Sequence, residues 1–89
     1  MPAAEEASGA ETLATLVELE PESAIAHFTY GRALFLEKKY EAATRSMKNA
    51  IRCNPHYLLS YLIGGQAFEK LGDKEAANAF YVSGLQAAK

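Results

Sequence analysis

The sequence predicts an all-α protein of about five helices, in which antiparallel helical hairpins stack side by side. Its 89 residues suit one small domain, and 49% hydrophobic with 22% charged residues is a globular composition. Proline and glycine recur 34 residues apart, at Pro21 with Pro55 and at Gly31 with Gly65. In the same register fall the apolar pairs Leu34 with Phe68, Met47 with Tyr81, and Ile51 with Leu85. A fixed period of this length is typical of stacked helical repeats.

The chain divides into an acidic lead and a helical domain. We expect residues 1–10 to form a flexible acidic segment and residues 11–89 to form the single domain. An apolar stripe predicts the first helix over residues 11–19; its members are Leu13, Leu16, Val17 and Leu19. This helix should stop at Glu20, because the residue before a proline is pushed away from α geometry.

Two helices follow over residues 24–37 and 40–53. Ser23 precedes the first of them and is a favoured N-cap residue, since its hydroxyl can accept a hydrogen bond from a free amide of the first turn. The second should end at Asn54, which precedes Pro55. A short turn between the two helices favours an antiparallel hairpin.

The last two helices are predicted over residues 58–71 and from Asp73 to about Ala87. Gly72 suits the left-handed position past a helix end, and Asp73 suits the next N-cap. Gly64 and Gly65 lie inside a helix, where each costs about 1 kcal/mol relative to alanine. We expect these glycines to admit Phe80 or Tyr81 at a close helix crossing; a functional hinge is the less favoured alternative.

The residues resemble the tetratricopeptide repeat family, whose unit is a 34-residue helix-turn-helix. The first unit matches the family pattern at Tyr30, Gly31, Leu34, Ala43, Met47, Ala50 and Pro55. The second matches it at Tyr61, Gly65, Phe68, Ala77, Tyr81 and Gly84, and in the turn Leu71, Gly72, Asp73. The resemblance implies a partial unit over residues 11–23, repeat one over 24–57, repeat two over 58–89, and a short right-handed superhelix. Lys38 and Lys39 depart from the family's Gly-Asp turn, and Gly64 replaces a large apolar residue.

The residues give little support to catalysis, so we expect no enzyme and no cofactor. His27 falls at a position that the family fills with an inward side chain, which favours a packed histidine. His56 has no paired acid nearby in sequence. With Cys53 it would give zinc two ligands at most, whereas structural zinc takes four. No metal site is therefore expected.

The charges give no strong indication of a nucleic-acid partner. The net charge is −2, with six acids and no bases in residues 1–22 and nine bases and five acids in residues 23–89. Arg45, Lys48 and Arg52 recur along one helix face, where a solvated surface is favoured over a nucleic-acid site. The lead is either an acidic arm that meets this stripe or another protein, or a solubilising terminus, which we favour.

The single cysteine and the sequence of the N-terminus favour a cytoplasmic protein. Cys53 cannot form an internal disulfide, and the first residues lack the basic and apolar regions of a signal peptide. The longest apolar stretch, residues 57–65, is far shorter than the roughly 20 residues that span a bilayer. We therefore expect no membrane partner.

The resemblance implies protein–protein interaction through a concave groove lined by the first helix of each unit. The residues expected in this groove are Ile25, Phe28, Arg32, Phe35, Leu36, Leu59, Leu62 and Gln66. Their apolar character suits a helix or extended peptide of a partner protein, while the carboxylate clamp of some family members is not matched. The alternative is a self-associating scaffold, with a homodimer interface at the groove or at the last helix.

Overall fold

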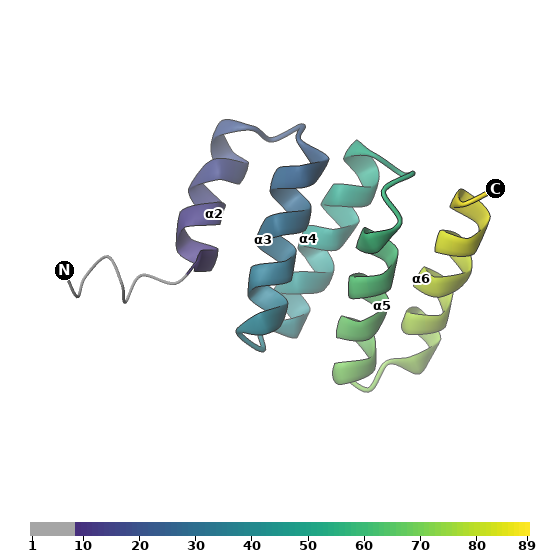
Figure 1. Cartoon of the computed structure of the whole chain (residues 1–89). Helices are drawn as coiled ribbons and strands as arrows, with labels where there is room; N and C mark the ends of the chain where they lie inside the picture. The colour runs from purple at the N-terminus through teal and green to yellow at the C-terminus, as the bar shows by residue number, and fades with distance from the viewer. Residues whose placement is uncertain (1–8) are drawn as a thin grey trace.

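The computed structural model describes residues 9–89 as five helices without a strand (Figure 1). The helices are α2 (Gly9–Leu19), α3 (Ala24–Leu36), α4 (Tyr40–Cys53), α5 (Leu59–Lys70) and α6 (Lys74–Ala87). Each packs against the next along the chain and runs in the opposite direction. The predicted all-α stack of helical hairpins is therefore confirmed. Residues 1–8, most of the predicted acidic segment, lie outside the described residues.

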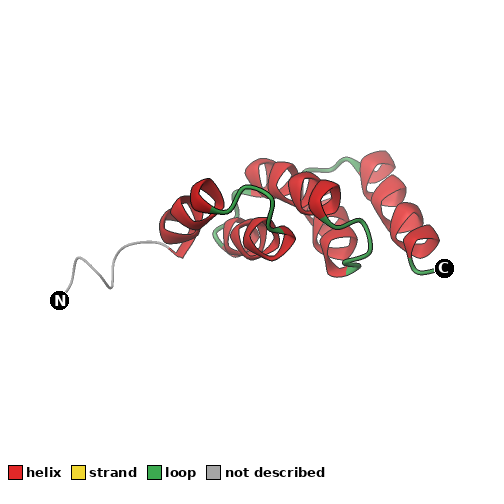
Figure 2. Cartoon of the chain, turned by 90° about the horizontal axis from the view of Figure 1, so that it is seen from above, coloured by secondary structure: helices red, strands yellow, loops and turns green. Residues whose placement is uncertain are grey.

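The helices alternate between two layers (Figure 2). One layer holds α3 and α5, which also approach each other, and the other holds α2, α4 and α6, which do not approach one another. Helices that come together in one layer and separate in the other make the stack bend. The α3–α5 layer is therefore the inner, concave side of the stack.

The observed helix ends follow the predicted capping residues closely. The Ser23 hydroxyl accepts a hydrogen bond from the amide of Ala26 at 3.1 Å, and the Asp73 carboxylate accepts one from the amide of Ala76 at 3.0 Å. The first described helix includes Gly9 and Ala10, two residues before the predicted start at residue 11. Ala10 is buried in the same core cluster as Leu34, and this burial extends the helix toward the N-terminus.

The 34-residue period governs contacts as well as residue types. His27 donates a hydrogen bond from Nε2 to the carbonyl oxygen of Pro21 at 2.8 Å. In the next unit Tyr61 donates from its hydroxyl to the carbonyl oxygen of Pro55 at 2.7 Å. In both units the side chain lies six residues after the proline and ties the first helix to the turn before it. His27 is buried, as predicted, and its role here is structural.

Close helix crossings account for the glycines inside the helices. A Cβ atom on Gly64 would overlap the ring of Phe80, and one on Gly65 would overlap the ring of Tyr81. The predicted reason for this glycine pair is therefore confirmed. Gly31, the equivalent of Gly65 in the first unit, lies against Met47 in the same way. Each hairpin thus places a large residue of its second helix against a glycine of its first.

The turns of the two hairpins have the same geometry although their residues differ. Gly72 has a φ of 82° and Lys38, 34 positions earlier, has a φ of 65°. The residue after each donates its amide to an equivalent carbonyl at 2.9 Å, Lys39 to Leu34 and Asp73 to Phe68. The Lys38-Lys39 turn therefore has the geometry of the Gly72-Asp73 turn and places a lysine in the left-handed region.

Lys38→Gly is expected to raise the free energy of unfolding by about 1 kcal/mol. The left-handed conformation costs a non-glycine residue roughly 1–2 kcal/mol, and the greater chain entropy of glycine in the unfolded state offsets part of the gain. Urea denaturation followed by circular dichroism measures the change. The reciprocal variant Gly72→Lys should lower stability. A loss of stability in Lys38→Gly would contradict the shared turn geometry.

Candidate protein-interaction surface

The inner layer carries a row of side chains that are exposed or, at Gln66, half-buried, and we call this row the concave stripe. Its members are Ile25, Arg32 and Leu36 on α3 and Leu59 and Gln66 on α5. Ile25 is 59% exposed, Leu36 is 64% exposed and Leu59 is 47% exposed, although all three are large and apolar. Ile25, Arg32 and Leu36 fall on one side of α3, because Arg32 lies seven residues, or two turns, after Ile25 and Leu36 lies four residues, or one turn, after Arg32. Leu59 and Gln66 repeat the positions of Ile25 and Arg32 in the second unit.

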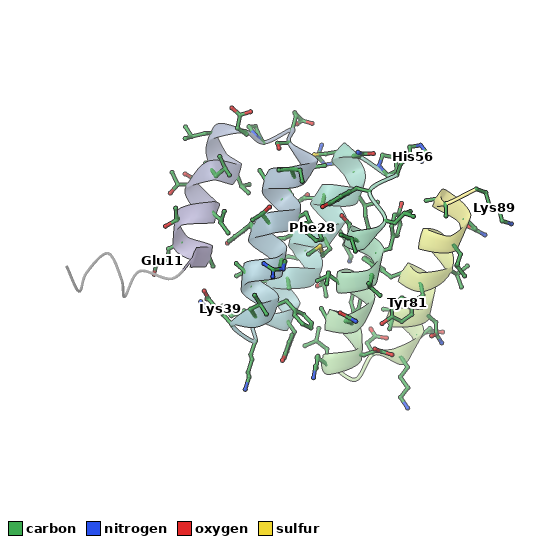
Figure 3. The ribbon with its side chains drawn as sticks, viewed as in Figure 1. Glu11, Phe28, Lys39, His56, Tyr81 and Lys89 are labelled. Carbon is green, nitrogen blue, oxygen red and sulfur yellow. The ribbon has the colours of Figure 1, made fainter. Side chains whose placement is uncertain are left out.

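Phe28 does not belong to this surface, and its predicted place in the groove is wrong. It is only 8% exposed and packs in a core cluster with Met47 and Ala50 (Figure 3). Its ring meets that of Tyr57 edge-on, with the centroids 4.9 Å apart. The reason is that α3 is apolar on several sides and buries more than one of them.

Phe35 and Leu62, two further predicted groove residues, make other contacts, although Leu62 lies next to Leu59 and Gln66 on the surface of α5. Phe35 is half-buried and packs edge-on against Tyr40, the first residue of α4, with ring centroids 5.3 Å apart. Leu62 lines a hollow of about 360 Å³ at the far end of the stack, between α5 and α6. Of the eight predicted residues, Phe28 is buried and Phe35 packs against Tyr40, whereas the other six keep exposed or half-buried positions on α3 and α5.

Tyr81 on α6 is tied to α5 beside this hollow (Figure 3). Its hydroxyl donates a hydrogen bond to the Glu69 carboxylate at 3.0 Å. Burial raises the pKa of the Tyr81 hydroxyl above its usual value, and the Glu69 carboxylate raises it further. The hydroxyl therefore stays protonated at neutral pH and serves as a donor that joins two helices.

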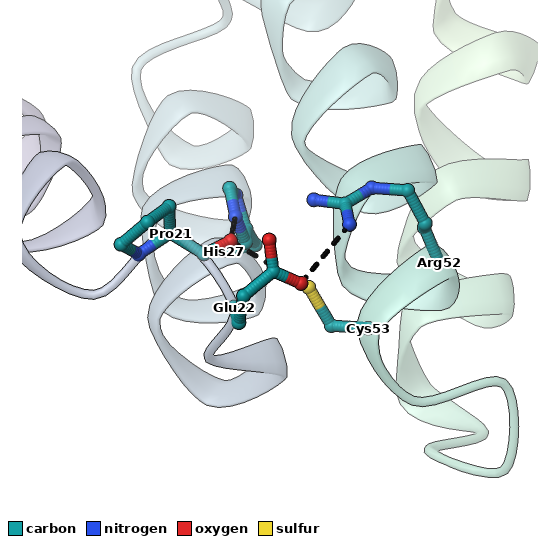
Figure 4. Close-up of polar contacts among 5 residues, drawn as sticks. All are labelled: Pro21, Glu22, His27, Arg52 and Cys53. Carbon is teal, nitrogen blue, oxygen red and sulfur yellow. Dashed lines mark hydrogen bonds and ion pairs between the residues drawn. The ribbon is translucent and has the colours of Figure 1, made fainter.

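Two residues of the predicted basic stripe on α4, Arg52 and Lys48, make contacts within the chain. Arg52 pairs with Glu22 at 3.2 Å, across the corner where His27 and Cys53 approach the carbonyl of Pro21 (Figure 4). The ammonium group of Lys48 lies 5.6 Å from the ring centroid of Phe68. An exposed ion pair contributes about 0–1 kcal/mol, so the Arg52–Glu22 pair adds little to stability.

The described residues contain neither a cluster of metal-ligand side chains nor a helix that could span a membrane. Within residues 9–89, histidine, cysteine and acidic side chains form no group of three or more that could hold a metal ion. None of the helices in this range has the length and apolar character needed to cross a membrane.

No protein-family model matches the chain, and no curated protein matches it significantly.

Proposed function

We propose that this chain is a non-catalytic protein-interaction module of tetratricopeptide type, which binds a helix or an extended segment of a partner protein along its concave stripe. One observation carries the proposal. Ile25, Leu36 and Leu59 stand exposed on the inner side of a stack of helices. An exposed apolar row of this kind is a surface on which a partner gains free energy by excluding water.

The polar members of the stripe can orient a bound segment by hydrogen bonds, which the apolar residues cannot form. Arg32 is exposed between Ile25 and Leu36, and Gln66 holds the equivalent place on α5. A guanidinium offers several fixed donors, and an amide offers both donors and an acceptor. These groups suit the main-chain carbonyls or carboxylates of a bound segment, while the apolar residues supply affinity.

Leu36→Glu combined with Leu59→Glu is expected to weaken partner capture at least tenfold. Burying an unpaired carboxylate in an apolar interface costs more than the 1.4 kcal/mol that corresponds to a tenfold change in affinity. The measurement is affinity capture from cell extract with the immobilised chain, followed by quantitative mass spectrometry. The partner is the protein that the wild type enriches over an unrelated helical protein.

The matched control is Asn49→Glu, which adds the same charge at an exposed position of α4 in the other layer. It should capture the partner as the wild type does, and circular dichroism should report equal helix content in all three proteins. Equal capture by the double variant and the wild type would contradict the assignment of the concave stripe.

A further inference from the structure

The hollow at the far end of the stack is the repeat equivalent of a filled core cluster. In the first unit the buried cluster consists of Phe28, Met47 and Ala50. The residues 34 positions later are Leu62, Tyr81 and Gly84, and all three line the hollow of about 360 Å³. The residues at these repeat positions are therefore buried in the first unit, whereas those of the second unit line an open hollow.

The structure also shows what closes the cluster in the first unit. The Tyr57 ring, in the turn before α5, meets the Phe28 ring edge-on at 4.9 Å, and Ile63 of α5 packs against the same cluster. Within residues 9–89 no helix takes the equivalent place against the second unit, and Leu62 is 44% exposed and Leu85 70% exposed. The element that fits these positions is thus a helix with an aromatic residue in the turn before it and a branched aliphatic residue six positions after that aromatic.

The chemistry of the open surface is apolar. We call it the end face and define it by Leu58, Leu62, Tyr81, Gly84 and Leu85, all of which line the hollow. The Tyr81 hydroxyl is already bonded to Glu69, and that of Tyr61, the other tyrosine of the lining, is bonded to the Pro55 carbonyl. An occupant therefore needs an apolar side and no polar group directed at these hydroxyls.

We propose that the end face docks an amphipathic helix of a different protein, in the way that α5 docks on the first unit. A second folded copy of this chain does not have such a helix free, because its Tyr57 and Ile63 are held in its own core. At its opposite end it presents α2, which has no aromatic residue. The end face adjoins the concave stripe on α5, but its Tyr81, Gly84 and Leu85 lie on α6, which contributes nothing to the stripe.

A peptide with the sequence of residues 54–71, acetylated and amidated, is the probe for this docking. Titrated into the ¹⁵N-labelled 89-residue chain, it should give saturable shifts of the amide resonances of Leu62, Tyr81, Gly84 and Leu85. Changing Tyr57→Ala in the peptide, or Leu85→Glu in the protein, should weaken binding at least tenfold. Leu85 is exposed, so circular dichroism should report an unchanged fold for its variant.

Leu36→Glu separates this inference from the proposed function, because it alters the concave stripe and should leave peptide affinity within twofold. The proposal is overturned if the peptide shifts no resonance of the end face at about 1 mM, a concentration that half-saturates a site with a Kd of about 1 mM. It is also overturned if the peptide shifts the concave stripe instead. Sedimentation that shows a dimer lost in Leu85→Glu would assign the end face to a second copy and overturn it as well.

Discussion

Met47→Ala is expected to lower the free energy of unfolding by about 2–5 kcal/mol, the range for truncating a large buried aliphatic side chain. Met47 is fully buried and packs in the cluster with Phe28 and Ala50. Its side chain also fills the space left by Gly31. Alanine would leave a cavity between helices of both units that backbone movement closes only in part. Urea denaturation followed by circular dichroism gives the change.

The matched control is Asn49→Ala, an exposed substitution on the same helix, which should change stability by no more than about 0.5 kcal/mol. If Met47→Ala lowered the free energy of unfolding by no more than this control does, Met47 would not be packed between the two units.

Gly64→Leu is expected to destabilise the chain by about 1–3 kcal/mol, as overpacking of a filled core does. The Cβ atom alone would overlap the Phe80 ring and lie 3.3 Å from Cβ of Met47. Leucine is a better helix former than glycine by somewhat less than 1 kcal/mol, which is too little to offset the displacement of α6 from α5. Chemical denaturation again measures the effect.

Two further variants identify the cause. Gly9→Leu should not destabilise the chain, because nothing lies within 4 Å of the Cβ position at Gly9. Adding Phe80→Ala to Gly64→Leu should recover part of the lost stability, since it vacates the overlapping space. A stabilising effect of Gly64→Leu alone would show that α5 and α6 do not cross closely at this glycine.

Much of the fold follows from local chemistry that the sequence displays. Pro21 and Pro55 stop helices, Ser23 and Asp73 cap them, and each of these effects depends on neighbouring backbone alone. The glycine pair was interpretable because a residue that costs helix stability inside a helix needs a packing reason. Periodicity then places the helices in order, since short turns leave antiparallel hairpins as the simple arrangement.

The site was less predictable, because burial depends on what the rest of the chain places nearby. Phe28 and Leu62 hold the same position in the repeat, yet α5 covers only Phe28. Ser60 is fully buried and its hydroxyl has no partner within the described residues, whereas Ala26 holds the equivalent place in the first unit. Neither the exposure of Leu62 nor the burial of Ser60 can be predicted from the residue alone. Both become apparent when the second unit is compared with the first.

Site-directed photocrosslinking tests the proposed partner site most directly. A photoreactive phenylalanine derivative is placed at residue 36, on the concave stripe, and in a separate protein at residue 49, on the other layer. Irradiation in cell extract is expected to link the captured partner to residue 36 and to leave residue 49 unlinked. Linkage through residue 49 with none through residue 36 would contradict the concave stripe as the binding surface.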